Sequence, residues 1–144
     1  MEIRPGTNAD YAEAITLIVE FTEEALAEYG IILDPQKLQK TFDELLATSF
    51  TAVVEGKVVG IFAGRVGTDV CSDLPVYEEI IWYMNKKYRR HGVKLLRHVM
   101  AWCKERGIER MVLALTHNSK AEKITKFYNR LGFKAQETRF VGRI

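Results

Sequence analysis

The segment from Ile80 to Leu96 places a strand, a basic stretch and a helix in immediate succession. Ile80-Ile81-Trp82-Tyr83 is apolar and rich in β-forming residues, whereas apolar residues recur at helical spacing from Val93 onward. The cations fall between these two patterns, over Lys86 to His91. The first turn of a helix carries unpaired N–H groups and the positive end of the helix dipole, and Gly92 lets a ligand approach the backbone. The junction therefore predicts a phosphate-binding site.

Arg89, Gly92 and Lys94 fix the spacing within this junction. Arg-x-x-Gly opening a helix after a strand resembles the acetyl-CoA pyrophosphate loop of the GNAT superfamily of N-acetyltransferases, whose pattern is Gln/Arg-x-x-Gly-x-Gly/Ala. Lys94 departs from the small residue of that pattern, although its backbone N–H and its ammonium group can still meet a phosphate. Met84, at the strand end, is expected to offer a backbone N–H to the acetyl carbonyl. The resemblance thus implies a cofactor-binding set of Met84, Arg89, Arg90, His91, Gly92, Val93 and Lys94.

A second local match lies further along the chain, in Phe127-Tyr128-Asn129-Arg130-Leu131-Gly132-Phe133. This run is similar to the helix-ending YxxLGF segment of the same family, in which the tyrosine faces the sulfur of acetyl-CoA. The resemblance implies that Tyr128 is the general acid that protonates the departing thiolate. The alternative is that Tyr128 only packs at the end of its helix.

Periodicity and turn residues give an order of elements for the whole chain. An α/β fold in the order β-α-α-β-β-β-α-β-α-β is expected, with a mixed, mostly antiparallel sheet and helices on both faces, as in GNAT proteins. At 144 residues the chain is expected to be one domain, 1–144. Strands are expected at 2–4, 50–54, 57–66, 78–84, 110–115 and 133–141. Helices are expected from 7 or 8 to about 21, at 23–29, from 34 to 46, from about 93 to about 106, and at 119–131.

Two adjacent carboxylates, Glu78 and Glu79, begin the expected central strand. A lysine-like amine titrates near pH ~10, so acyl transfer to it at neutral pH needs a base or a water relay. Alternation along a strand sends the two side chains to opposite faces, so only one of them can enter the cleft. The resemblance matches Glu78 to the base of the protein-acetylating branch of the family. Solvation of the strand end is the alternative for both.

Composition excludes several other classes. The formal charge of +2 comes from 21 basic and 19 acidic residues, so a nucleic-acid binder is not expected. The sequence shows no leader pattern and no membrane span, which predicts a cytoplasmic protein without a membrane partner. Cys71 and Cys103 are expected to be free thiols, and the histidines lack metal-ligand spacing, so no metal site is expected.

The expected activity is acetyl-CoA-dependent transfer to a primary amine by direct attack on the thioester. The acceptor is a small molecule or a peptide, and a homodimer is possible because many relatives form one. Asp69 and Asp73 lie in the loop expected beside the acceptor cleft, and their negative charges favour a cationic amine. The alternative is a GNAT-fold module that binds CoA without catalysis and acts as a sensor or interaction domain.

Overall fold

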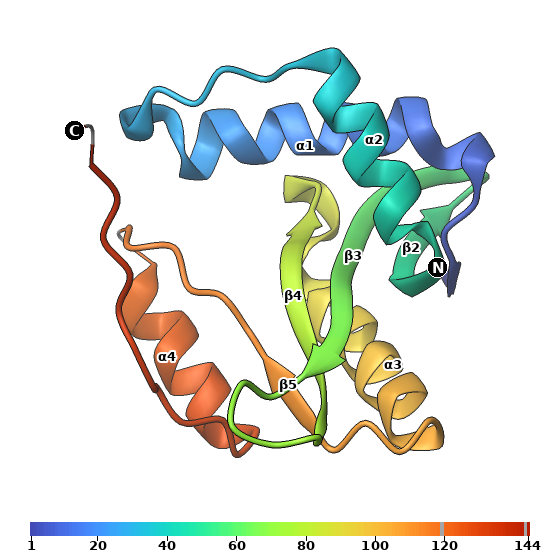
Figure 1. Cartoon of the computed structure of the whole chain (residues 1–144). Helices are drawn as coiled ribbons and strands as arrows, with labels where there is room; N and C mark the ends of the chain where they lie inside the picture. Colours follow the sequence, from blue (N-terminus) through green and yellow to red (C-terminus); the bar gives the residue numbers. More distant parts are fainter. Residues whose placement is uncertain (119, 143) are drawn as a thin grey trace. The chain divides into compact units, whose positions relative to one another are not determined.

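The computed structural model describes residues 1–118, 120–142 and 144. Two compact units are present, Met1–Ala114 and Leu115–Ile144. The first contains a five-stranded sheet in the order β1-β2-β3-β4-β5 (Figure 1). Its elements are β1 (Glu2–Pro5), α1 (Tyr11–Ala25), α2 (Pro35–Leu45), β2 (Ser49–Val54), β3 (Lys57–Thr68), β4 (Pro75–Met84), α3 (Gly92–Glu105) and β5 (Arg110–Val112). The second unit contains α4 (Ala121–Arg130).

The sheet is mixed, as predicted. Neighbouring strands from β1 to β4 pair antiparallel, and β4 pairs with β5 in parallel. The predicted hairpin turn between β2 and β3 is confirmed, because Glu55 and Gly56 both have positive φ angles, 52° and 77°, as a tight two-residue turn requires. The parallel β4–α3–β5 crossover places the start of α3 beyond the end of β4.

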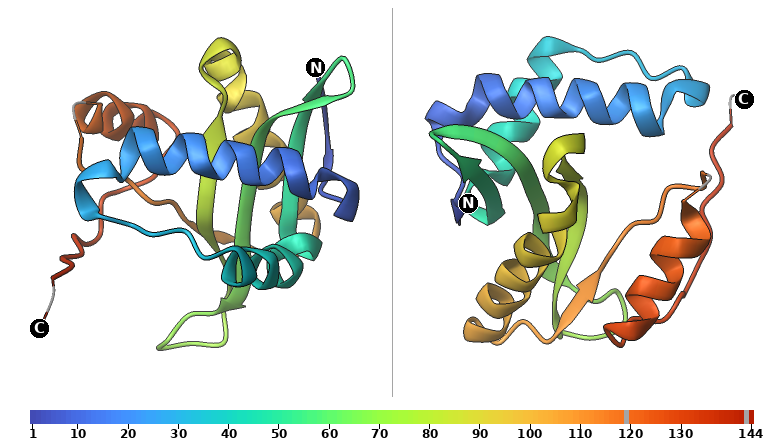
Figure 2. Two further views of the ribbon diagram at one scale, coloured as in Figure 1. Left: turned by 90° about the horizontal axis from the view of Figure 1, so that it is seen from above. Right: turned by 180° about the vertical axis from the view of Figure 1, so that it is seen from behind.

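Helices cover both faces of this sheet (Figure 2). On one face, Phe21 of α1 packs against Tyr83 of β4, with ring centroids 5.9 Å apart. On the other face, Phe50 of β2 packs against Trp102 of α3 at 5.3 Å. Successive strand side chains point to opposite faces of the sheet, so the apolar ones form two separate layers of core. One layer lies beneath α1 and α2 and the other beneath α3.

Local polar contacts fix the beginnings of the two N-terminal helices. Thr7 and Asp10 form a capping box, and the Asp10 carboxylate also accepts two bonds of 2.8 Å from Arg4. The Arg4 hydrogen bond holds the pKa of Asp10 below its ordinary value even though Asp10 is buried. At α2, the side chain of Asp34 accepts the N–H of Lys37 at 2.7 Å, and Pro35 occupies the first helical position.

The predicted fold class is confirmed, but several boundaries differ. β4 begins at Pro75 rather than Glu78, because pairing with β3 extends it into the expected loop. β5 ends at Val112 rather than residue 115. The expected 23–29 helix is the end of α1 followed by a 3-10 turn, Ala27–Tyr29. The expected start of α4 at Ser119 lies outside the described residues.

The expected final strand over 133–141 is wrong for the described residues, which form no strand there. Thr138, Phe140 and Val141 are β-formers, but a strand needs a partner that takes its backbone hydrogen bonds. The described sheet ends at β5, and the side chains of Phe140 and Val141 are exposed. Propensity alone therefore does not make this segment a strand.

Candidate active site

β4 loses its partner on one side partway along its length. On the β3 side, pairing runs from Pro75 to Met84. On the β5 side, among the described residues, pairing covers only Val76, Tyr77 and Glu78. The two parallel strands therefore diverge after Glu78, and the second half of β4, from Glu79 to Met84, has no pairing on that side among the described residues. Such a divergence leaves strand backbone available to a ligand, in the position that open α/β sheets use for binding.

The two candidate bases lie on opposite faces of β4, as alternation predicts. Glu78 pairs across the sheet with Arg65, and Arg65 forms an ion pair of 3.8 Å with Glu44 of α2. Glu78 therefore lies on the face that α1 and α2 cover. Glu79 pairs with Gly64 on the opposite face, and its carboxylate accepts the N–H of Ala114 at 2.9 Å.

The surroundings of Glu79 in the fold shift the pKa of its carboxyl group. It stands at the first position of β4 beyond the pairing with β5, and its side chain reaches to Ala114, which follows β5 in the chain. Burial raises the pKa of Glu79 to about 7, and the hydrogen bond from Ala114 only partly opposes this. A carboxyl group with this pKa exists in both protonation states at neutral pH, which is what proton transfer requires.

A β-bulge lies directly beside Glu79. Ala63 pairs with Ile81 and Gly64 pairs with Glu79, so Ile80 has no cross-strand partner on β3. The bulge turns Ile80 out of the regular alternation, and 41% of its surface is exposed. This feature was not predicted, because two consecutive isoleucines look like any buried strand.

The basic stretch forms a 3-10 helix, Lys86–His91, that runs directly into α3. Asn85 caps it by accepting the N–H of Lys87 at 3.1 Å. The N–H of Gly92 donates to the carbonyl of Arg89, so this donor is already used within the segment. The expected loop is therefore a 3-10 helical turn.

The side chain of Arg89 turns towards helix α1. Its guanidinium lies 2.5 Å from the carboxylate of Glu24 and over the ring of Tyr83, 5.8 Å from the centroid. Burial by itself lowers the pKa of Arg89, but the hydrogen bond and charge of Glu24 outweigh it and hold the pKa above its ordinary value. Glu20 supports the same contact by accepting the amide of Asn85 at 3.1 Å. The sequence shows the i, i+4 spacing of Glu20 and Glu24, but it does not reveal that these carboxylates bind Asn85 and Arg89.

The remaining cations of the segment form a small positive surface. Arg90 and Lys94 are exposed, and the Arg90 side chain donates to the imidazole of His91 at 3.1 Å. Loss of water contact lowers the pKa of His91, and the charges of Arg90 and Lys94 lower it further. His91 is therefore mainly neutral at pH 7, and Arg90 and Lys94 carry the local positive charge. Val93 is half-buried behind them.

Gly92 is buried against the end of β4. A Cβ atom at this position would lie 3.4 Å from the side chain of Met84 and 3.5 Å from that of Trp82. Met84 is itself buried and packs against Gly60 from the other side. Gly92 thus lets α3 approach the strand closely. Its missing side chain faces the protein interior.

Tyr128 lies in the second compact unit, near the end of α4. Its half-buried ring lies 5.8 Å from that of Phe127 and 6.2 Å from that of Phe133. The carbonyl of Tyr128 accepts the N–H of Phe133 at 3.0 Å, and Gly132 takes a positive φ of 89° to make this turn. The predicted helix end at Gly132 is thereby confirmed.

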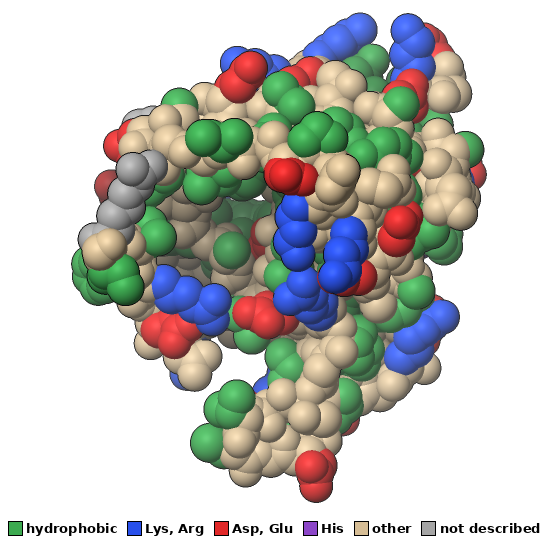
Figure 3. Space-filling model, turned by 45° about the horizontal axis from the view of Figure 1, so that its top comes forward, with side chains coloured by type: hydrophobic (Ala, Val, Ile, Leu, Met, Phe, Trp, Pro, Cys, Tyr) green, Lys and Arg blue, Asp and Glu red, His purple; other side chains and the backbone are tan. Residues whose placement is uncertain are grey.

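The surface carries both signs of charge. Figure 3 shows lysine and arginine side chains beside aspartate and glutamate side chains on the face that it presents. No described helix is long and apolar enough to cross a membrane. The described residues contain no cluster of three or more histidine, cysteine or acidic side chains that is suited to a metal.

Known structures of acetyltransferases have the same fold. An acetyltransferase from Trypanosoma brucei is 18% identical, with a TM-score of 0.74 and 99% of each chain covered. A ribosomal-protein-alanine N-acetyltransferase from Brucella melitensis biovar Abortus is 18% identical, with a TM-score of 0.72 and 99% and 98% of the two chains covered. An aminoglycoside acetyltransferase from an uncultured soil metagenomic sample is 23% identical, with a TM-score of 0.72 and 99% and 95% covered.

Sequence comparison gives the family directly. A search among curated proteins finds no significant match. The profile of the Acetyltransferase (GNAT) family, however, matches residues 15–133, which include the diverging end of β4, the basic 3-10 turn and Tyr128. The chain therefore belongs to the GNAT family of N-acetyltransferases.

Proposed function

We propose that the protein transfers the acetyl group of acetyl-CoA to a primary amine by direct attack on the thioester, with Glu79 as the base. The observation that carries this proposal is a carboxyl group of pKa about 7 at the point where β4 and β5 diverge. Glu78, which the sequence favoured, lies on the other face of the strand and pairs with Arg65. It is the natural control for Glu79.

The residues near the start of α3 fit an acidic cofactor. GNAT membership implies acetyl-CoA, which supplies an acetyl thioester whose C–S bond breaks as the amine nitrogen forms the amide. Arg90 and Lys94 are exposed cations suited to its phosphates. Met84, Gly92 and Val93 would hold the strand and helix ends at which it binds, and His91 would offer a neutral imidazole.

Arg89 has a more demanding role in this proposal. Its side chain is bound to Glu24, so it contacts a phosphate only by sharing or leaving that carboxylate. A guanidinium has five N–H donors, and one ion pair does not use them all. We assign Arg89 to the cofactor on the strength of its position one turn before Gly92.

Three proton transfers complete the reaction. The ionised Glu79 takes a proton from the acceptor ammonium, because the free amine is scarce at neutral pH. Tyr128 donates a proton to the thiolate as it departs, since a phenol with a pKa near ~10 is protonated at pH 7. The second proton that the nitrogen loses as the amide forms restores the phenol of Tyr128. The amide and CoA thiol are the products.

The acceptor is a small molecule or a peptide amine. Structural neighbours include enzymes named for an aminoglycoside and for a ribosomal-protein alanine, so the fold alone serves acceptors of both kinds.

Release of CoA from acetyl-CoA in the presence of an amine panel tests the proposal. Mass spectrometry of the amines should show the gain of one acetyl group. Glu79→Gln should lose most of this activity at neutral pH, whereas Glu78→Gln should retain it. Binding of CoA without acetylation of any amine would instead support a non-catalytic module.

A further inference from the structure

Two carboxylates of α1 meet the end of β4 and the basic 3-10 turn that follows it. Glu24 accepts hydrogen bonds from the Arg89 guanidinium at 2.5 Å and from the Tyr83 hydroxyl at 3.1 Å. Glu20, one turn earlier in the helix, accepts the side-chain amide of Asn85 at 3.1 Å. These contacts join two carboxylates to one cation, so the cluster carries net negative charge beside a segment assigned to phosphates.

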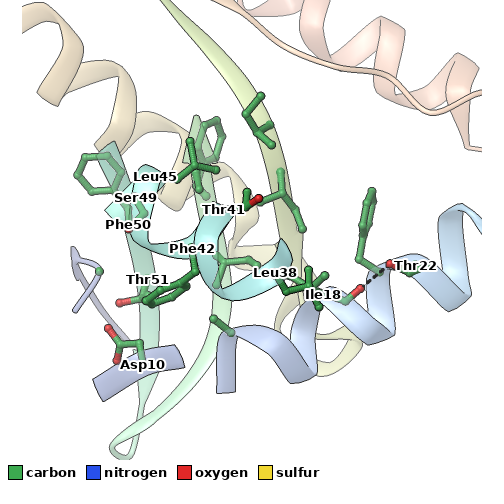
Figure 4. Close-up of a pocket in the computed structure, with 18 of the residues that line it drawn as sticks. Asp10, Ile18, Thr22, Leu38, Thr41, Phe42, Leu45, Ser49, Phe50 and Thr51 are labelled. Carbon is green, nitrogen blue, oxygen red and sulfur yellow. Dashed lines mark hydrogen bonds between the residues drawn. The ribbon is translucent and has the colours of Figure 1, made fainter. Parts of the chain in front are cut away.

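The helix that carries Glu24 is anchored to the sheet by its apolar side. Leu17 belongs to the same buried core as Tyr83, and Ile18 lines the apolar cavity between α1, α2 and the sheet (Figure 4). The guanidinium of Arg89, by contrast, lies at the end of a long side chain with several rotatable bonds. Glu24 can therefore follow Arg89 towards a ligand only if the whole helix moves.

A phosphate at Arg89 competes with Glu24 for the same guanidinium. Carboxylates and phosphates bind arginine through the same kind of charge-assisted hydrogen bond. An arriving phosphate must either displace Glu24 or share the guanidinium with it, and sharing places two anions side by side. Displacement leaves Glu24 the hydroxyl of Tyr83 as a donor. In both cases the contact between Glu24 and Arg89 subtracts from the free energy of cofactor binding.

We propose that Glu24 is a competing ligand of Arg89 that lowers the affinity of the protein for acetyl-CoA and for CoA. The inference rests on the proposed function, in which Arg89 binds the cofactor, and it adds a residue that sets how tightly the cofactor is held. Substrate and product contain the same pyrophosphate, so the competition acts on both. Its consequence is faster release of CoA, a step that limits turnover in many enzymes.

Calorimetry of Glu24→Gln with CoA, in the absence of any amine, tests the inference. Glutamine keeps the shape of the side chain and can still accept the Tyr83 hydroxyl, but it has no charge with which to hold Arg89. The Kd for CoA should fall by about 3- to 5-fold, the scale of a partly exposed ion pair. Glu23→Gln removes the same charge from the exposed neighbouring position and is the matched control. It should leave the Kd unchanged at about 0.15 M salt, where distant surface charges are screened.

The gain in affinity must depend on Arg89. In an Arg89→Ala background, Glu24→Gln should no longer tighten CoA binding, because no guanidinium is left to release. A gain of equal size with and without Arg89 would show that Glu24 repels the cofactor directly, and it would refute the competition. Weaker binding in the folded Glu24→Gln variant would also overturn the inference, since Glu24 would then orient Arg89 for the phosphate. An unchanged Kd would overturn it as well.

Two further measurements keep the outcomes distinct. Glu24→Asp is one methylene shorter, which draws the carboxylate back from the guanidinium, so it should show part of the gain even if the glutamine variant does not fold. CoA binding needs no acceptor, so the calorimetric prediction stands even if no amine is acetylated and the proposed reaction fails. Unchanged CoA affinity in Arg89→Ala alone would remove this inference and leave the reaction standing.

Discussion

Replacing Glu79 with glutamine removes the proposed base and little else. Glutamine has nearly the same shape, and its side-chain oxygen can still accept the N–H of Ala114, which Glu79 accepts at 2.9 Å. The carboxyl group of Glu79 has a pKa of about 7 because burial raises it. In the wild type, kcat/KM should therefore rise tenfold per pH unit below about pH 7 and level off above it, as the ionised base captures a proton from the acceptor ammonium.

The variant should behave differently because it can use only the free amine. An alkylamine with a pKa near ~10.4 is neutral in about one part in 10³ at pH 7. The kcat/KM of Glu79→Gln should thus climb tenfold per unit from pH 7 to about 10, with no break near 7. The wild type should exceed the variant by about 10³-fold at pH 7, within the usual range for acid–base catalysis, and the ratio should shrink towards pH 10.

The assay is CoA release at subsaturating amine over this pH range, with Glu78→Gln as the matched control. That control should keep the break near pH 7. A pH-independent loss in Glu79→Gln would show that the carboxylate positions a strand or a ligand instead of moving a proton. A break that disappears only in Glu78→Gln would transfer the role to the other face of β4.

Other predictions follow from single contacts. Burial raises the pKa of Glu79 from 4.5 to about 7, so between these pH values the folded protein holds a proton on Glu79 that the unfolded chain has lost. The contribution of Glu79 to stability therefore falls as the pH rises from 4.5 to about 7. The melting temperature of Glu79→Gln should fall less than that of the wild type over the same pH range. Gly92→Ala should change the free energy of unfolding by under ~1 kcal/mol, because the added Cβ would lie at ordinary contact distances from its neighbours. Gly92→Val should lower the free energy of unfolding by ~1–3 kcal/mol, because the larger side chain overpacks the same space. Denaturant titration measures both changes. Arg89→Ala should weaken acetyl-CoA binding by ~1.5–3 kcal/mol in calorimetry; unchanged affinity would mean that Arg89 serves only its pair with Glu24. Tyr128→Phe should lower turnover by at most ~10²–10⁴-fold with acetyl-CoA affinity and melting temperature preserved, and full turnover with chemistry rate-limiting would make it a packing residue.

Features set by neighbouring residues were predictable from the sequence. The apolar run before the cations and the helical period after them place β4 and α3 almost where the structure has them. Glu55-Gly56 predicts the hairpin turn because few residue pairs adopt two positive φ angles. Gly132 likewise predicts the end of α4. In each case a local conformational preference decides the outcome.

Features set by distant parts of the chain were not predictable. The partner of Arg89 is Glu24, 65 residues away, and no local pattern points to it. The raised pKa of Glu79 depends on burial, which only the packed sheet provides. The predicted strand that contains Phe140 and Val141 was wrong for the same reason. Pairing with another strand is a property of the fold and not of the segment.

Helix α1 contacts both the core of the sheet and the cofactor segment. Ile18 and Phe21 line an apolar cavity between α1, α2 and the sheet, and Glu20 and Glu24 of the same helix bind Asn85 and Arg89 of the cofactor segment. The i, i+4 spacing puts both carboxylates on one face, so any shift of the helix moves the cavity wall and the carboxylates together. An acceptor that repositions α1 must change the affinity for acetyl-CoA, and binding linkage requires acetyl-CoA to change the affinity for that acceptor by the same factor. Substrate preference measured without the cofactor would therefore miss part of the selectivity that this helix confers.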